Sequence, residues 1–220
     1  MSFAELFPSP ATSALVVLAA YLLGSLSGSL LLGRLRGVDI RTQGSGNAGG
    51  TNAFRTQGAK FALGVVLVDI GKGALAAWLG IRFAPVAVPL AVPVHGYLAA
   101  FAAVLGHVWP AWHGFRGGKG AATLVGTLAV LWPWALAAIV PTWLLVLILT
   151  GYVGLATVLA GLLLPLLAWW GGAEAPRLTF TVAVAALLVF THRANLQRLA
   201  AGTESRFAQA RLLHRLRRGD

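Results

Sequence analysis

The chain has 220 residues, of which 58% are apolar and only 10% charged, with 17 Lys and Arg against 6 Asp and Glu. A soluble domain is about a quarter charged, so this composition excludes one and indicates a bilayer protein. Nucleic-acid binding is not indicated, because the basic residues lie between apolar runs and form no solvated face beside a soluble core. The absence of cysteine excludes disulfides, thiolate metal sites and a cysteine nucleophile.

Long apolar stretches predict membrane-spanning helices, since one span needs roughly 20 mostly apolar residues. The first stretch is too long for the core of a cleaved signal, about 7–15 residues, so we expect a retained span. We therefore expect an all-α polytopic membrane protein in which residues 1–220 form a single integral-membrane domain. The apolar stretches cover residues 11–33, 61–83, 84–106, 121–170 and 178–191, and the polar segments cover residues 34–60, 107–120 and 192–220.

Basic residues predict the orientation of the chain in the membrane. The three polar segments and their borders hold nearly all Lys and Arg residues, whereas the opposite side holds only Arg82 and Arg177. By the positive-inside rule, the polar segments and the C-terminus face the cytoplasm and the N-terminus faces out. The three polar segments can therefore meet on one side. Residues 195–218 combine leucines with many arginines, which predicts a basic helix anchored on the anionic cytoplasmic leaflet.

The span count depends on residues 121–191. The predicted orientation requires an odd number, and we expect a bundle of seven transmembrane helices, with five as the alternative. Seven spans put four helices in this stretch, whereas five put two there and place the turn at 171–177 outside. Pro and Gly mark turns but are tolerated inside membrane helices, so both alternatives remain open. The candidate break residues are Pro133, Pro141, Gly151 and Gly154.

The first polar segment contains Gly-Ser-Gly-Asn-Ala-Gly-Gly-Thr-Asn-Ala-Phe-Arg at residues 44–55. Glycines let consecutive backbone amides form a concave anion site, and the forked cation of Arg55 suits phosphate oxygens. A flexible loop is the alternative, since Gly, Ser and Asn are common turn formers. We favour an anion site because the loop contains a cation and no carboxylate. Its other candidate residues are Gly44, Ser45, Gly46, Asn47, Gly49, Thr51 and Asn52.

The second polar segment contains Phe-Arg-Gly-Gly-Lys-Gly-Ala-Ala-Thr at residues 115–123, directly before an apolar run. A glycine-rich turn entering a helix directs amides, the positive helix end and the Lys119 ammonium at one anion. The Walker spacing is absent, which argues against a nucleotide hydrolase. A basic interface turn is the alternative. The other candidate residues are Gly117, Gly118, Gly120 and Thr123.

The third polar segment begins with His192, three residues before Asn195, so the two share a helical face and could point at one ligand. Imidazole titrates near neutral pH, which suits either an interface residue or a catalyst. Glu204 could pair with an arginine of the polar segments in a structural role.

Few ionisable residues lie elsewhere in the apolar stretches. Asp69 and Lys72 are three residues apart within the second stretch, and we expect them to pair, because a charge at a helix centre costs about 2.5–3.5 kcal/mol. His107 and His113 flank the second loop without a tight carboxylate cluster in the sequence, so we expect no metal site.

Together the three motifs resemble the acyl-phosphate glycerol-3-phosphate acyltransferase family (PlsY). Its members carry Gly-Ser-Gly-Asn-x-Gly-x-Thr-Asn-x-x-Arg, a Gly-Gly-Lys-Gly-x-Ala-Thr loop and a His-Arg-x-Asn element, and the resemblance covers nearly the whole chain in order. It implies transfer of a fatty acyl group from acyl phosphate to the 1-hydroxyl of sn-glycerol 3-phosphate, giving lysophosphatidate and phosphate, the first acylation of bacterial phospholipid synthesis. It further implies a multi-pass enzyme of the bacterial inner membrane, with its active site toward the cytoplasm and no cofactor. A monomer is the default expectation.

The resemblance also implies which residues act. Ser45, Arg55, Lys119, His192 and Asn195 are expected to be catalytic, and the remaining motif residues to bind substrate. Arg55 and Lys119 would hold phosphate groups and offset charge on the leaving phosphate. The general base could be His192 or the acceptor's own phosphate. Ser45 could be a nucleophile, but no adjacent base is evident, so a binding role is favoured.

A transporter of an organic phosphate is the rival interpretation, because it too would need cytoplasmic anion loops within a polytopic bundle. Such a protein should show internal repeats and polar residues near the midplane of several helices. The glycine motifs do not repeat, and the polar groups cluster at one interface, which favours an enzyme. Three separate anion motifs argue against a purely structural scaffold.

Overall fold

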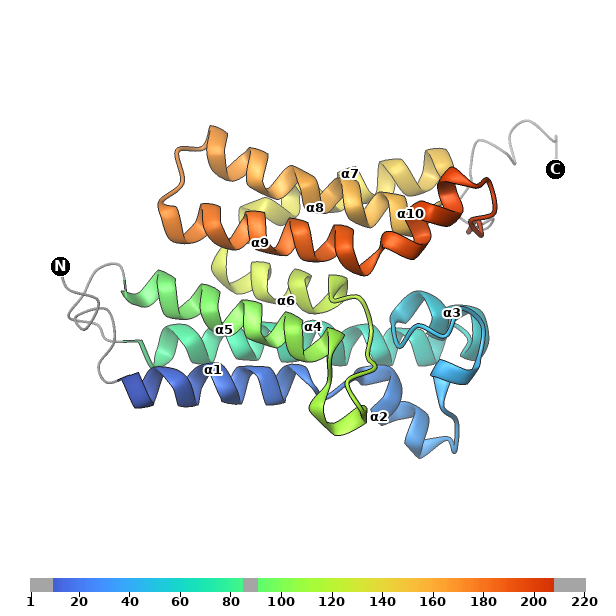
Figure 1. Cartoon of the computed structure of the whole chain (residues 1–220), viewed down its shortest axis with the longest axis horizontal. Coiled ribbons are helices and arrows are strands. Elements are labelled where there is room, and N and C mark those ends of the chain that lie inside the picture. Colours follow the sequence, from blue (N-terminus) through green and yellow to red (C-terminus); the bar gives the residue numbers. More distant parts are fainter. Residues whose placement is uncertain (1–9, 85–90, 208–220) are drawn as a thin grey trace. The chain divides into compact units, whose positions relative to one another are not determined.

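A computed structural model describes residues 10–84 and 91–207 of the chain. Within these ranges every regular element is a helix, as the sequence predicts (Figure 1). Four of these helices are long and apolar enough to cross a membrane, and up to six spans result if each of two bent helix pairs is one span. Contacts divide the chain into two compact units, Met1–Pro133 and Trp134–Asp220.

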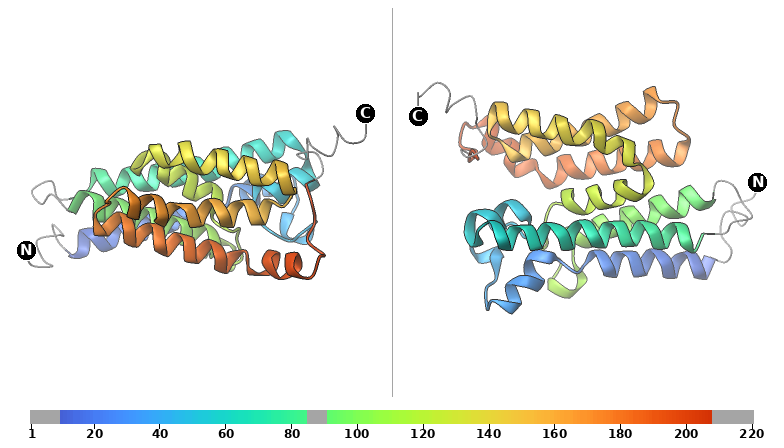
Figure 2. Two further views of the ribbon diagram at one scale, coloured as in Figure 1. Left: turned by 90° about the horizontal axis from the view of Figure 1, so that it is seen from above. Right: turned by 180° about the vertical axis from the view of Figure 1, so that it is seen from behind.

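The first unit is a helical bundle with its polar elements at one end. Figures 1 and 2 show α1, α4 and α5 side by side, with α2 and α3 at the end where α1 finishes. The first two polar segments therefore lie at the same end of this unit, as predicted. The elements are α1 (Pro10–Gly24), α2 (Gly28–Leu35), η2 (Ile40–Thr42), α3 (Gly50–Gln57), α4 (Ala59–Arg82), α5 (Ala91–Val108), η3 (Ala111–His113) and α6 (Ala121–Leu131). The predicted start of the third stretch, residues 85–90, lies outside the described residues.

The first apolar stretch is not one continuous helix. α1 and α2 are bent by 49° at a short break between Gly24 and Gly28. A break inside a membrane leaves backbone groups without helical partners, and these must be satisfied by other protein groups. Here Lys72 Nζ donates to the Leu26 carbonyl at 3.0 Å, and the Gly28 amide donates to Asp69 Oδ1 at 3.0 Å. The buried ion pair of α4 thus stabilises the bend.

Glycines let α4 and α6 approach almost to backbone contact. A Cβ on Gly73 would overlap the carbonyl of Thr123, and a Cβ on Gly126 would overlap the carbonyl of Ile70. Small residues at helix interfaces allow such close packing in membranes, where no hydrophobic force drives helices together. The position of α6, and of the loop that precedes it, is therefore determined by α4.

We expect Gly126→Ala to destabilise the protein by about 1–3 kcal/mol, the usual cost of overpacking, because the backbone of α4 cannot yield. Gly71→Ala is the matched control, since a Cβ there meets nothing within 4 Å. The midpoint of thermal unfolding in detergent should fall for Gly126→Ala and should be unchanged or slightly raised for Gly71→Ala. Equal midpoints for the two variants would contradict the proposed packing.

The second unit contains α7 (Pro133–Thr150), α8 (Val153–Trp170), α9 (Ala175–Thr191) and α10 (Arg193–Ala200). Together with α6, residues 121–191 therefore form four helices, as the seven-span alternative requires. The helix breaks lie before Pro133 and at Gly151, whereas Pro141 and Gly154 lie inside helices. Because α6 is short and two helix pairs are bent, the number of membrane spans stays a prediction.

The predicted basic helix over residues 195–218 is confirmed for residues 195–200, which belong to α10, but is wrong for residues 201–207. α10 ends at Ala200, Gly202 takes a φ of +71°, and the Thr203 amide bonds back to the Arg198 carbonyl at 2.8 Å. Such a left-handed glycine is a common helix terminator. Residues 203–207 are not helical, and residues 208–218 lie outside the described residues.

Candidate active site

The first glycine-rich loop is organised by the buried side chain of Asn52. Its Oδ1 accepts from the Ser45 amide at 2.9 Å, and its Nδ2 donates to the carbonyls of Ile40 at 3.1 Å and Gln43 at 3.0 Å. Gly44 has a φ of +54°, and a Cβ there would overlap Asn52 Oδ1. Asn52 was predicted to bind substrate. Its hydrogen bonds within the protein are those of a residue that fixes the shape of the loop.

The remaining residues of the first motif are on or near the surface. Ser45 and Gly46 are exposed at the turn, and Gly46 takes a φ of +70°. Asn47, Gly49 and Thr51 are half-buried around the start of α3, for which Gly49 is the N-cap residue. Arg55 lies in the last turn of α3 and is exposed. The loop therefore presents Ser45 and Arg55 to solvent.

The second glycine-rich loop is a tight turn that folds back on the end of α5. The Gly117 amide donates to the Val108 carbonyl and the Gly118 amide to the His107 carbonyl, each at 3.1 Å. Gly120 takes a φ of +89° as the N-cap residue of α6. This arrangement places Lys119, which is half-buried, directly before a helix N-terminus, as the sequence predicts.

Thr123 is fully buried in the first turn of α6, where its carbonyl faces Gly73 of α4. Its hydroxyl has no hydrogen-bond partner among the described residues. Thr123 was predicted to bind substrate, and direct contact would require a ligand to reach beneath the loop.

The two loops contact each other, which the sequence motifs alone did not establish. The carbonyl of Ala48 would be 2.7 Å from a Cβ on Gly118. Arg41 also joins the loops, because its Nη1 donates to the carbonyls of His113 at 2.9 Å and Arg116 at 3.3 Å. The first two motifs therefore form one continuous surface.

Arg41 lies outside the three motifs, and the sequence-based prediction gave it no individual role. Asp39, two residues earlier, could have indicated an ion pair with Arg41. The Arg41 guanidinium donates to both carboxylate oxygens of Asp39, with Nη2 and Oδ2 at 2.7 Å. This hydrogen bonding lowers the pKa of Asp39 to about 2, so the carboxylate stays ionised at neutral pH. The fixed carboxylate holds the arginine in position to bridge the loops.

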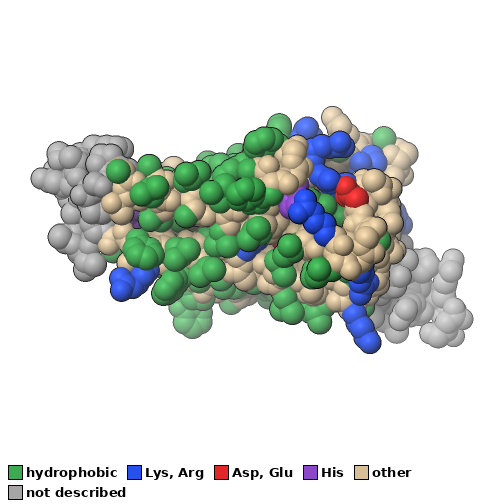
Figure 3. All heavy atoms as spheres, turned by 90° about the horizontal axis from the view of Figure 1, so that it is seen from below, with side chains coloured by type: hydrophobic (Ala, Val, Ile, Leu, Met, Phe, Trp, Pro, Cys, Tyr) green, Lys and Arg blue, Asp and Glu red, His purple; other side chains and the backbone are tan. Residues whose placement is uncertain are grey.

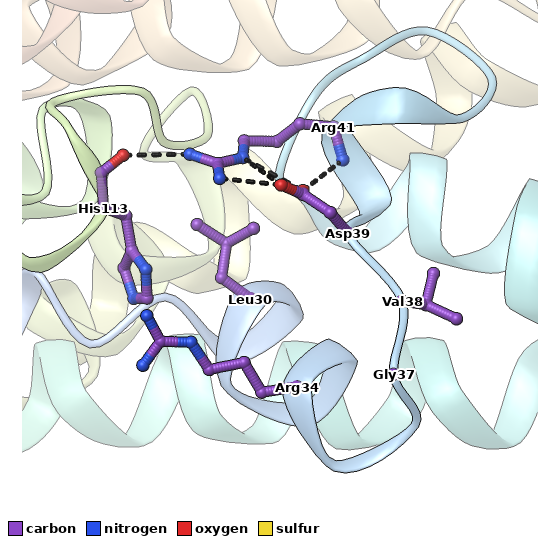
Figure 4. Close-up of a pocket in the computed structure, with 7 residues that line it drawn as sticks. All are labelled: Leu30, Arg34, Gly37, Val38, Asp39, Arg41 and His113. Atoms are coloured by element: carbon purple, nitrogen blue, oxygen red, sulfur yellow. Dashed lines mark hydrogen bonds and ion pairs between the residues drawn. The ribbon is translucent and has the colours of Figure 1, made fainter.

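A surface pocket of about 320 Å³ lies beside this bridge (Figure 4). Figure 4 shows the guanidinium of Arg34 and the imidazole of His113 pointing toward each other. Figure 3 shows that Lys and Arg side chains gather at this end of the first unit, whereas hydrophobic side chains cover the helices. None of the predicted site residues lines the pocket. Its lining residues are Leu30, Arg34, Gly37, Val38, Asp39, Arg41 and His113.

The buried pair predicted in the second apolar stretch is confirmed, and a third ionisable residue joins it. Lys72 Nζ lies 2.8 Å from Asp69 Oδ1. His107 Nδ1 lies 2.9 Å from Lys72 Nζ and 3.4 Å from Asp69 Oδ1, so a histidine–carboxylate contact exists where the sequence indicated none. This contact could not be predicted from local spacing, because His107 is far from α4 in the sequence. No group of three or more metal-binding side chains occurs within residues 10–84 and 91–207.

The third motif lies in the second unit, at the junction of α9 and α10. His192 is buried, and its Nδ1 lies 2.8 Å from the Leu188 carbonyl, which can only accept, so the ring proton is on Nδ1. Asn195 Nδ2 donates to Glu204 Oε1 at 2.6 Å. Arg198 Nε donates to Glu204 Oε2 at 2.7 Å, which confirms the predicted pairing of Glu204 with an arginine.

Known proteins resemble this chain over most of its length. The family model described as glycerol-3-phosphate acyltransferase matches residues 14–202. The chain is 41% identical over 206 residues to the glycerol-3-phosphate acyltransferase of Bordetella avium, across 90% of this chain and 95% of that relative. This chain belongs to the glycerol-3-phosphate acyltransferase family. The family match includes all three motifs and parts of both units.

Two solved structures confirm the family fold. Both are crystal structures of PlsY (YgiH), an integral membrane glycerol 3-phosphate acyltransferase. The glycerol 3-phosphate form matches with a TM-score of 0.82 and 33% identity, over 89% of this chain and 95% of that one. The lysophosphatidic acid form matches with a TM-score of 0.81 and 31% identity, over 90% and 97%. The expected all-helical membrane fold and the resemblance inferred from the motifs are thus confirmed.

Proposed function

We propose that the protein transfers a fatty acyl group from acyl phosphate to the 1-hydroxyl of sn-glycerol 3-phosphate, giving lysophosphatidate and inorganic phosphate. The contact between the two glycine-rich loops at Ala48 and Gly118 carries this proposal. It puts the loop of Arg55 and the loop of Lys119 on one surface. Two phosphorylated substrates need two anion-binding elements, and this surface offers both.

The chemistry requires little beyond binding and charge stabilisation, because acyl phosphate is already activated. The acceptor hydroxyl oxygen attacks the acyl carbonyl carbon, the bond from that carbon to the phosphate oxygen breaks, and the hydroxyl proton passes to a base. Arg55 and Lys119 offset the charge on the departing phosphate, and amide or hydroxyl donors polarise the carbonyl. Ser45 is assigned to binding, since no described hydrogen bond connects its side chain to a base.

The proposed base is His192 or the phosphate of the acceptor. With the proton of His192 on Nδ1, the lone pair of its ring is on Nε2, the form that a general base requires. Asn195 completes the proposed catalytic set through the His-Arg-x-Asn motif, and Glu204 fixes its amide. We further propose that residues 1–220 act as one domain in the bacterial inner membrane, with the site toward the cytoplasm.

Phosphate release by the purified protein in detergent tests this function. Palmitoyl phosphate alone should release little phosphate, and adding sn-glycerol 3-phosphate should give equal amounts of phosphate and lysophosphatidate. The enantiomer sn-glycerol 1-phosphate controls for specific acceptor binding, and palmitoyl-CoA tests the donor. Equal use of palmitoyl-CoA would overturn the acyl phosphate proposal. No acyl transfer from well-folded protein would favour a transporter, to be tested by organic phosphate flux into liposomes.

A further inference from the structure

The buried cluster of Asp69, Lys72 and His107 has no role in the proposed chemistry, yet burying it is costly. The three residues are 1%, 5% and 2% exposed, respectively. A single charge within a membrane helix costs about 2.5–3.5 kcal/mol, so such residues usually serve a function. Hydrogen bonding to the backbone at the break between α1 and α2 explains why Asp69 and Lys72 are buried there. It does not explain His107, which makes no described hydrogen bond to the break.

The hydrogen bonding of His107 directs its second nitrogen toward the glycine loop. The Lys72 ammonium can only donate, so Nδ1 of His107 accepts its hydrogen bond and the ring proton is assigned to Nε2. A Cβ added to Gly118 would overlap that Nε2, and it would lie 2.7 Å from the Ala48 carbonyl. The imidazole therefore supports the contact between the two loops from beneath.

Lys119 directly follows Gly118, and the residues after Lys119 also pack against the helices of the bundle. Gly120 packs on α5, where a Cβ would lie 2.8 Å from Val104 Cγ1. The first turn of α6 rests on Gly73, the neighbour of Lys72 in α4. The backbone on both sides of Lys119 is thus supported by the two helices that carry the buried cluster.

We propose that Asp69, Lys72 and His107 are positioning residues that act through Lys119. Asp69 holds Lys72, Lys72 fixes the ring orientation of His107, and His107 sets the height of the Gly118–Lys119 backbone above the bundle. This inference rests on the proposed function of Lys119. A displacement of about 1 Å in an active site can reduce turnover about 100-fold, which is the expected size of the effect.

The test compares His107→Ala with His95→Ala in the acyl transfer assay. His95 is the matched control, because it is also a buried histidine of α5, bonded to Ser13 at 2.7 Å. We expect both variants to lose stability, but only His107→Ala to lose about 100-fold in kcat/KM per folded protein. His107→Gln, which retains an acceptor and a donor, should recover part of that loss. Equal activity of the two alanine variants would overturn the inference.

A double-mutant cycle with Lys119→Ala separates positioning from a general loss of structure. If His107 acts through Lys119, adding His107→Ala to Lys119→Ala should cost little more, whereas independent effects would multiply. Hydrogen exchange of the amides at residues 115–120 gives a readout without activity. Exchange should be faster in His107→Ala than in His95→Ala, and equal exchange would overturn the inference. An inactive wild-type protein would refute the proposed function instead, while the exchange comparison would still decide the role of His107.

Discussion

Gly118→Ala is expected to abolish acyl transfer, with a loss of at least about 100-fold in kcat/KM, as for a 1 Å displacement of the catalytic groups. An added Cβ would overlap His107 Nε2 and lie 2.7 Å from the Ala48 carbonyl. Neither atom can yield, because the imidazole is buried on the ion pair and the carbonyl belongs to the other loop. The variant must therefore separate the two loops.

Gly114→Ala is the matched control for this substitution. Gly114 lies in the same turn with a φ of +63°, and a Cβ there would meet no atom within 4 Å, so alanine brings only backbone strain. That strain costs about 1–2 kcal/mol of stability and should leave acyl transfer near the wild-type rate. Comparable activity of Gly118→Ala and Gly114→Ala would show that the loop contact is not needed for the reaction.

Arg55→Ala is expected to reduce acceptor-dependent phosphate release by about 10²–10³-fold, the usual effect of removing one charge-stabilising group. Arg55 is exposed on α3, so its loss should leave the fold intact. Arg55→Lys should recover only part of the activity, because an ammonium keeps the charge but not the planar fork that binds two phosphate oxygens.

Arg82→Ala is the control for Arg55, since Arg82 lies at the opposite end of the first unit, beside the ring of Phe83. Its removal should not change kcat/KM in the same assay. Near-normal turnover by folded Arg55→Ala protein would remove Arg55 from the proposed catalytic set. A similar loss in both variants would indicate a general effect of charge on the membrane protein.

Features that depend on residue type and local spacing were predictable from the sequence. Apolar length predicts helices in a bilayer, and Gly120 before an apolar run predicts the start of α6. Asp69 and Lys72 were paired correctly because residues three apart share a helix face. The failures involved competing local signals, as where Gly202 ends the helix predicted to continue through residue 218.

The partners of polar groups distant in sequence could not be predicted. His107 meets Asp69 only because α5 packs on α4, and Arg41 bridges to His113 only because the two loops fold to the same end. Likewise, the break between α1 and α2 depends on an ion pair about 40 residues later that satisfies its backbone. The local spacing of residues along the sequence does not indicate such contacts.

The sequence by itself determined that this is a helical membrane protein and, through three dense motifs, which family it belongs to. Both follow from properties of short segments, namely apolar length and the backbone freedom of clustered glycines. The tertiary structure decided which groups support the loops, because that depends on how closely helices approach. Gly73 and Gly126 let α4 and α6 approach closely, and the packing of α5 on α4 buries the cluster of Asp69, Lys72 and His107 beneath the loop that carries Lys119.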